Sequence, residues 1–309
     1  MTSVVIAAHN EEAVIGRCLD ALLADAPAGS LDVTVVANGC ADATAEVAAA
    51  RPGVRVLNLP EAGKPGALNA GDAVALGFPR VYLDADIVLS PGALDALVAA
   101  LSRSGAGGNG PTPLAVVPRR SLDLTGRPLL IRGFYAINSR LPVYQRALFG
   151  RGAIALSAAG RARFPSFPQM TADDLFLDSL FDADEKGEVA QATSRVAAPR
   201  RTRDLVRRLV RVRAGNAAMR AAAAGGAAPS GVRPSARSSW LRDVVLPRPW
   251  LAPAAACYVG ITLAAALLAR HRARSGTAGW GHDASTRRPA GQTAATAAHI
   301  PTQELENDG

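Results

Sequence analysis

The first hundred residues alternate four times between a short apolar run and a helix-compatible segment. The apolar runs are rich in β-branched residues and lie at 3–8, 31–39, 54–59 and 80–89. Segments with helix-compatible patterns follow them at 11–26, 42–50, 65–76 and 91–101. Because parallel strands need crossover connections that are usually helices, this alternation predicts an α/β fold with a mostly parallel sheet and helices on both faces. Two further runs, 114–120 and 152–157, are candidate later strands of the same sheet.

Charge divides the chain into two parts. Residues 1–194 hold 16 Lys and Arg against 20 Asp and Glu, whereas residues 195–309 hold 18 against 6. This asymmetry predicts an acidic catalytic unit followed by a helical, basic C-terminal arm that meets anions such as lipid headgroups. We expect a catalytic domain, a linker, an apolar and basic membrane-associating segment and a disordered tail, at 1–215, 216–239, 240–274 and 275–309 respectively.

Polar residues follow the ends of the predicted strands. Asp84 and Asp86 flank one residue at the end of the fourth apolar run. In a regular strand the two carboxylates would point the same way and repel each other unless a cation lay between them. A hard divalent cation with several open positions suits a nucleotide diphosphate, so this pair predicts a site for Mn²⁺ or Mg²⁺. The alternative is an exposed acidic turn, since short acidic motifs are common.

Three further clusters have both a functional and a structural interpretation. Lys64 precedes a helix start, where a cation and free backbone N–H groups suit phosphate, although the spacing is not that of a P-loop. Asp173 and Asp174 follow Thr171, a candidate helix N-cap. One of these acids is a candidate general base for an acceptor hydroxyl, or both simply favour the first helical turn. Asn10 and Asn38 follow the first two strands.

The ensemble of these segments resembles the family 2 glycosyltransferases, which have the GT-A fold. The resemblance covers roughly residues 1–215 and rests on segments such as "VVIAAHNEEAVIGRCLDAL", "EAGKPGALNAG", "VYLDADIVL" and "TADDLFL". It implies an inverting transfer of a sugar from a nucleotide-sugar donor to an acceptor hydroxyl, with the metal and nearby cations stabilising the departing diphosphate.

The resemblance also implies roles for particular residues. Asp86 and Asp84 match the metal-binding D-x-D, and Asp174 matches the family's general base, with Asp173 beside it. The glycine-bearing acceptor loop corresponds to Gly150, Arg151 and Gly152. Donor contacts are expected from Ala8, Asn10, Glu11, Asn38, Lys64, Asp84, Arg211 and Arg213.

Two departures from the family pattern affect the donor site. Ala37 and Asn38 stand where family members often carry an Asp-Asp pair that meets the donor base. The Asn38 carbonyl can still accept from uracil N3–H, so uridine, guanosine and other bases all stay open. The Gln-x-x-Arg-Trp motif of processive relatives is absent. Arg211 or Arg213 could supply its diphosphate contact, or both could lie on a solvated basic helix.

An uncharged run of 21 residues, 249–269, lies between arginines near the end of the chain. Its length reaches the range of a membrane span, but flanking arginines at both ends give no orientation. We expect it to lie on or partly in a membrane, with a soluble helix that closes the catalytic domain as the alternative. No signal-peptide pattern precedes the first strand. The expected location is therefore the cytoplasm, at the inner face of the plasma membrane, in cell-envelope glycan or glycolipid synthesis with a lipid-linked or polysaccharide acceptor.

Other functions fit parts of the pattern. A haloacid-dehalogenase-like phosphatase also ends an apolar strand in D-x-D, but there the motif lies on the first strand of the chain. A sugar-1-phosphate nucleotidyltransferase would carry a Gly-rich, Arg-bearing first loop, which "AAHNEEAV" is not. A non-enzymatic, basic membrane- or nucleic-acid-binding protein rests only on the tail, which has no recognisable nucleic-acid module, so no nucleic-acid partner is expected.

Overall fold

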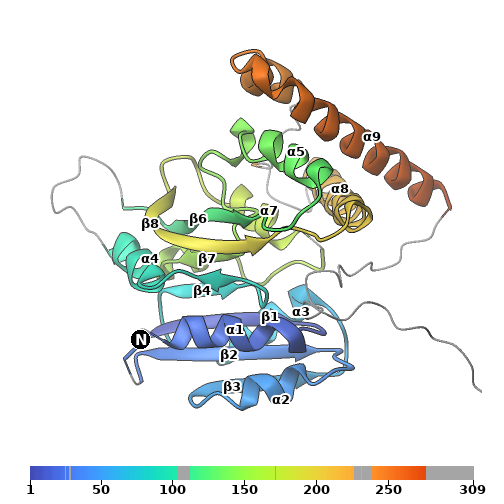
Figure 1. Ribbon diagram of the computed structural model, residues 1–309. Coiled ribbons are helices and arrows are strands. Elements are labelled where there is room, and N and C mark those ends of the chain that lie inside the picture. Colours follow the sequence, from blue (N-terminus) through green and yellow to red (C-terminus); the bar gives the residue numbers. More distant parts are fainter. Residues whose placement is uncertain are drawn as a thin grey trace, which may run out of the picture.

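The computed structural model of the protein describes residues 1–24, 26–27, 29–102, 112–170, 172–225, 231 and 238–275. Within these residues one eight-stranded sheet forms the centre of the fold (Figure 1). Its strands lie in the order β3 (Val54–Leu59), β2 (Leu31–Asn38), β1 (Thr2–Ala8), β4 (Arg80–Leu83), β7 (Ala153–Leu156), β6 (Ala115–Asp123), β8 (Lys186–Ala197) and β5 (Val88–Leu89).

The first half of the sheet is parallel. β1 pairs in parallel with both β2 and β4, and β2 pairs in parallel with β3. The carboxyl ends of these four strands therefore lie along one edge of the sheet. β7 runs antiparallel to its neighbours β4 and β6, and β6 pairs in parallel with β8. The predicted α/β fold with a mostly parallel sheet is confirmed, including both of the later strands.

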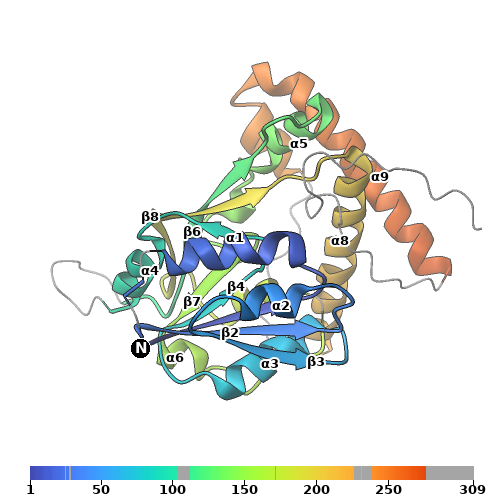
Figure 2. The same cartoon turned by 60° about the horizontal axis from the view of Figure 1, so that its bottom comes forward.

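Helices cover both faces because alternate residues of β1 point into different cores. Val4 and Ile6 pack with residues of α1 (Glu12–Leu23), α2 (Thr44–Ala49) and α4 (Ala93–Ser102). Val5 packs on the opposite face, together with residues of α3 (Lys64–Val74) and α7 (Asp173–Ser179). The short helix α6 (Ala158–Arg161) follows β7. Figure 2 shows α1 and α2 in front of the sheet, with α8 crossing the side on which the parallel strands end.

A helical layer lies beyond the β8 end of the sheet. It contains α5 (Leu129–Asn138), α8 (Thr202–Ala224) and α9 (Ala252–Ser275), with two short helices, Trp240–Val245 and Pro249–Leu251, before α9 (Figure 1). A one-turn helix, Pro142–Tyr144, follows α5. Phe134 of α5 stacks on Tyr258 of α9, with ring centroids 5.4 Å apart. The C-terminal helix is therefore packed against the fold through its own apolar contacts.

The structure corrects three predicted boundaries. The strand predicted over 80–89 is interrupted after Leu83 by a turn and resumes as the two-residue β5. The linker predicted from residue 216 does not begin there, because α8 continues without a break to Ala224. The segment predicted over 240–274 packs on α5 through Val244, Val245 and Ala255, so it is part of the folded body. The tail predicted over 275–309 lies almost entirely outside the described residues.

One helix among the described residues has the length and composition of a membrane span. It covers Pro249–Arg272 with a mean hydropathy of 1.9, and 17% of its most apolar window is buried. Large apolar side chains on its outer side are exposed, including Trp250, Leu263 and Leu267. Its inner side contributes Ile261 and Ala265, which are buried. The helix thus has one face in the protein core and one apolar face outside it.

Substitutions at two glycines test how closely α9 packs against α5. A Cβ at Gly133 of α5 would lie 2.9 Å from the Cβ and Sγ of Cys257, whereas a Cβ at Gly260 of α9 would meet nothing within 4 Å. We predict that Gly133→Ala lowers the free energy of unfolding by about 1–3 kcal/mol through overpacking. Gly260→Ala should raise it by about 0.5–1 kcal/mol, because alanine favours a helix. Denaturant unfolding of both variants checks this, and equal stabilisation by both would contradict the close approach of α5 and α9.

Candidate active site

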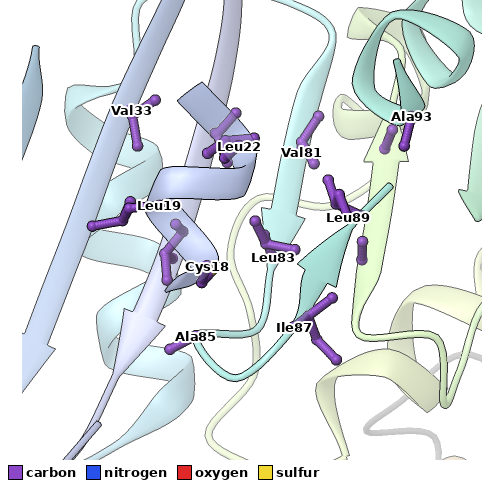
Figure 3. Close-up of a cluster of buried hydrophobic side chains, with 14 of the residues drawn as sticks. Cys18, Leu19, Leu22, Val33, Val81, Leu83, Ala85, Ile87, Leu89 and Ala93 are labelled. Atoms are coloured by element: carbon purple, nitrogen blue, oxygen red, sulfur yellow. The ribbon is translucent and has the colours of Figure 1, made fainter. Parts of the chain in front are cut away.

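The D-x-D segment forms the turn that ends β4. The Asp84 N–H donates to the Gly152 carbonyl at 2.8 Å, and the Ile87 N–H donates to the Asp84 carbonyl at 3.1 Å. Ala85 and Ile87 are buried in the core, as Figure 3 shows beside Leu83 and Cys18. Because these two apolar residues alternate with the acids, Asp84 and Asp86 are left half-buried at the edge of the sheet. The buried residues thus hold the two carboxylates at the surface, although the segment is a turn and not the predicted regular strand.

Lys64 joins the two acidic clusters. Its Nζ lies 2.7 Å from an Asp84 carboxylate oxygen and 2.8 Å from an Asp173 carboxylate oxygen. Burial acts to lower the pKa of Lys64, but Asp173 and Asp84 outweigh it and hold that pKa well above its ordinary value. Lys64 is therefore a permanent cation between β4 and α7. The sequence placed it at a helix start, and the structure confirms this, since α3 begins at Lys64 with Pro65 in its first turn.

The acidic pair occupies the first turn of α7. Asp174 accepts hydrogen bonds from the Gly150 N–H at 3.0 Å and from the Leu175 N–H at 2.8 Å. Burial and the neighbouring Asp173 raise the pKa of the Asp174 carboxyl to about 6, although Lys64 acts in the opposite direction. The N-cap of α7 is Ala172, while Thr171, the predicted cap, lies outside the described residues. Asp174 is thus a carboxylate whose proton affinity suits a general base near neutral pH.

The loop before β7 connects the two clusters. Gly150 and Gly152 adopt left-handed backbone conformations, with φ of 71° and 72°. A Cβ at Gly152 would lie 2.4 Å from Ile87, so the loop can approach the D-x-D turn only with glycine there. Gly152 bonds Asp84 and Gly150 bonds Asp174 through the backbone. The structure therefore brings the predicted acceptor loop, the D-x-D and the acidic pair together.

The Asn38 side chain holds the ends of β1 and β2 together, and these two strand ends form a corner of the site. The Asn38 side-chain N–H donates to the Ala8 carbonyl at 2.7 Å, and its oxygen accepts from the Gly63 N–H at 2.9 Å. Ala8 is 0% and Asn38 is 2% exposed. In this structure Asn38 joins β2 to β1 and to the loop that carries Lys64. The donor contacts of Ala8 and Asn38 stay predictions.

The neighbouring residues of this corner have different positions. Asn10 adopts a left-handed conformation with φ of 54° and is half-buried, and its side-chain oxygen accepts from the Ala41 N–H at 2.8 Å. Glu11 is 6% exposed, and its N–H donates to Thr44 at 2.7 Å. Both lie at the carboxyl edge, and their donor contacts stay predictions.

The two arginines proposed for the diphosphate lie on α8. Arg213 donates to the Thr262 carbonyl of α9 at 3.4 Å and is exposed, so it contacts the C-terminal helix instead of the acidic edge. The diphosphate contact of Arg213 stays a prediction. Arg211 is half-buried on the same helix, and its donor role stays a prediction.

A cationic groove beside the acceptor loop was missed by the sequence analysis. It lies between α5, β6 and the start of α9 and has a volume of about 1190 Å³. Arginines from separate elements line it, among them Arg120, Arg132, Arg140 and Arg151. Arg120 lies on β6, Arg132 on α5, Arg140 in the turn after α5 and Arg151 in the loop before β7, so no local spacing in the sequence could have gathered the full set.

This fold is the GT-A fold of glycosyltransferases. Residues 3–142, a little under half of the chain, match the profile described as glycosyl transferase family 2. The match confirms the resemblance found in the sequence and favours a glycosyltransferase over the phosphatase and nucleotidyltransferase alternatives.

Solved structures of glycosyltransferases share the fold. The mannosyltransferase PcManGT from Pyrobaculum calidifontis, in complex with GDP-Man and Mn²⁺, is 23% identical with a TM-score of 0.56 over 90% of this chain and 81% of that chain. TarS 1–349 from S. aureus, in complex with UDP-GlcNAc, is 18% identical with a TM-score of 0.50. That alignment covers 64% of this chain and 59% of the TarS chain. A comparison with curated proteins found no match.

The pKa of Asp174 generates a pH prediction. A general base must be ionised, and the Asp174 pKa of about 6 places its ionisation above that of an ordinary carboxyl. We predict that kcat/KM for sugar transfer rises with pH through about 6 and levels off above it. A pH–rate profile of the wild type checks this. A rate that is flat from pH 5 to 8 would remove Asp174 from the role of base, as in roughly that range an ordinary carboxyl is already ionised.

Proposed function

We propose that the protein is an inverting, metal-assisted glycosyltransferase that moves a sugar from a nucleotide-sugar donor to an acceptor hydroxyl. The observation that carries the proposal is the Lys64 bridge between Asp84 on the D-x-D turn and Asp173 beside Asp174. The carboxylates proposed to bind the donor therefore lie on one side of Lys64, and the candidate base lies on the other side. In a single displacement the leaving group departs from the same carbon that the activated acceptor attacks, so the donor-binding groups and the base must lie close together.

The donor side fits a divalent metal. The D-x-D turn offers only carboxylate oxygens, which suit Mn²⁺ or Mg²⁺, and Asp84 already holds a cationic group. Asp86 and Asp84 would hold the metal, which would neutralise the diphosphate when bound. Two protein carboxylates leave room for diphosphate oxygens and water as further ligands. The Mn²⁺ in the PcManGT complex supports this assignment.

On the acceptor side, Asp174 removes the hydroxyl proton. The acceptor oxygen forms a bond to the anomeric carbon as the bond from that carbon to the diphosphate oxygen breaks. The electron pair leaves with the diphosphate, and the Lys64 charge stabilises it. Asp173 is less suited to act as base, because its carboxylate is paired with Lys64 at 2.8 Å. Attack from the face opposite the diphosphate inverts the configuration at the anomeric carbon.

Nucleotide choice is open in this assignment. PcManGT was solved with GDP-Man and TarS with UDP-GlcNAc, so the shared fold is compatible with either base. The buried amide of Asn38 no longer favours uridine. Titration with UDP-, GDP- and dTDP-sugars in the presence of Mn²⁺ identifies the donor.

The exposed apolar face of α9 supports an assignment at the membrane. Trp250, Leu263 and Leu267 are 72%, 57% and 64% exposed on a helix that is long and apolar enough to cross a bilayer. We infer that α9 lies in the inner face of the plasma membrane, where the enzyme acts in cell-envelope glycan or glycolipid synthesis. Recovery of the full chain in the soluble fraction, without detergent or lipid, would contradict this location.

The division of labour between the acidic clusters gives a direct test. We predict that Asp86→Asn loses metal-dependent donor binding, because one of the two metal carboxylates is gone. Asp174→Asn should keep donor binding and lose transfer by about 10²–10⁴-fold, the usual contribution of a positioned general base. Calorimetry with the donor and Mn²⁺, beside the transfer rate, checks both.

Asp173→Asn is the matched control for this test. It changes the neighbouring acid without removing the proposed base, so its transfer rate should fall less than that of Asp174→Asn. If Asp174→Asn transfers sugar at nearly the wild-type rate, the base is misassigned. If excess chelator leaves the wild-type rate unchanged, the metal assignment is wrong.

A further inference from the structure

The groove beside the acceptor loop combines strong positive charge with apolar walls. Seven arginines line it against a single carboxylate, Glu188, among its described lining residues. Arg119 and Arg120 come from β6, Arg132 comes from α5, and Arg140 lies in the turn that follows α5. A concave surface lined by charges of one sign concentrates ligands of the opposite sign. The groove is therefore built to receive an anion.

Four of these arginines have no acidic partner within the described part of the chain. Glu188 is engaged, since its carboxylate lies 2.7 Å from the Arg151 guanidinium. No carboxylate of a described residue lies within 4.0 Å of Arg119, Arg120, Arg132 or Arg140. Arg140 donates to the Ala136 carbonyl at 2.6 Å, and Arg120 stacks on the Tyr144 ring at 4.6 Å. These contacts orient the guanidinium groups and leave their charge for a ligand.

Arg151 adds a buried element to the groove. It is 8% exposed and donates to the Tyr144 carbonyl at 2.8 Å. Its Nε has no hydrogen-bond partner. A buried donor without a partner costs free energy, so an arginine held in this way indicates a site that a ligand acceptor completes.

The other wall of the groove is apolar. Leu122 and Leu124 line it beside β6, Leu129 lies at the start of α5, and Pro253 and Ala254 belong to α9. Leu129 is 79% exposed. The groove therefore offers apolar surface to a ligand along the same path as the arginines.

The groove reaches the candidate base. The Arg120 guanidinium lies 3.7 Å from the position that a Cβ of Gly150 would occupy. The Gly150 N–H donates to Asp174 at 3.0 Å. An anionic group bound at Arg120 would thus lie next to the loop that holds Asp174, with the rest of the ligand extending toward α5 and α9.

We propose that this groove is the acceptor subsite and that it binds a phosphate ester of a lipid. The phosphate would lie among the arginines of β6 and α5, the apolar chains along Leu129 and α9, and the acceptor hydroxyl at Asp174. A phosphate ester carries up to two negative charges and matches several guanidinium forks. The acceptor role rests on the proposed function, whereas the binding of a lipid phosphate does not.

Calorimetry on the full chain without donor tests the proposal. Dioctanoyl phosphatidic acid carries both the phosphate and the chains, dioctanoylglycerol lacks the phosphate, and glycerol 3-phosphate lacks the chains. Arg132→Gln and Arg140→Gln change exposed positions that cannot disturb the core. Arg120→Gln changes the arginine nearest Gly150. Arg51→Gln is the control, because Arg51 pairs with Asp20 outside the groove.

The lipid phosphate should bind at least about tenfold more tightly than either partial ligand, and each groove variant should weaken it by about tenfold, the usual effect of losing a charged hydrogen bond. Arg51→Gln should bind as the wild type does. If dioctanoylglycerol binds as tightly as dioctanoyl phosphatidic acid, the groove does not recognise the phosphate. If glycerol 3-phosphate binds as tightly, the groove does not recognise the lipid chains, and the ligand is a soluble phosphate ester. Wild-type affinity in all three groove variants would place the ligand elsewhere and overturn the subsite.

A parallel titration with nucleotide-sugar and Mn²⁺ separates this proposal from the proposed function. Loss of lipid-phosphate binding with intact donor binding would contradict the groove alone. The absence of donor binding with intact lipid-phosphate binding would contradict the glycosyl-transfer assignment alone.

Discussion

The ion bridge of Lys64 is the contact on which the active site depends. Asp84, Asp173 and Asp174 come from β4 and α7, and Asp174 feels the repulsion of the other two carboxylates. Gathering such charges at a half-buried site is unfavourable unless a cation lies among them. Lys64 supplies that cation from the first turn of α3, and Asn38 fixes the loop before it through the Gly63 N–H. The corner formed by β1 and β2 therefore helps to position Lys64.

The glycine loop before β7 gives this bridge its second connection. Gly152 holds the D-x-D turn and Gly150 holds the base, both through backbone hydrogen bonds. Donor and acceptor groups are thus fixed to one short segment whose conformation only glycine adopts easily. The segment continues through Arg151 into the cationic groove. A single loop consequently links the diphosphate side, the base and the surface from which we infer that the acceptor arrives.

The sequence patterns predicted those features of the site that follow from where strands end and from the local spacing of residues. The parallel strands share an edge, so Asp84 and Lys64 could be assigned to one site from the sequence, and the family resemblance added the acidic pair. The hydrogen-bond partners of individual side chains could not be predicted from these patterns. Asn38 has the right type and place to meet a donor base, yet its amide is consumed by Ala8 and Gly63. The contact of Arg213 with α9 could not be predicted, because the sequence does not show that α9 lies beside α8. The groove was missed because its arginines come from elements that only the fold brings together.

The central claim is that one cation serves both the donor and the base. The pH–rate profile of Lys64→Gln, measured with the donor affinity, tests it most directly, with Lys64→Arg as the variant that keeps the charge. Lys64 lowers the pKa of Asp174, so its removal should move the rise in transfer rate to higher pH and also weaken donor binding. Lys64→Arg should retain more of both properties. A profile that rises at the wild-type pH in Lys64→Gln, with only donor affinity reduced, would contradict the claim.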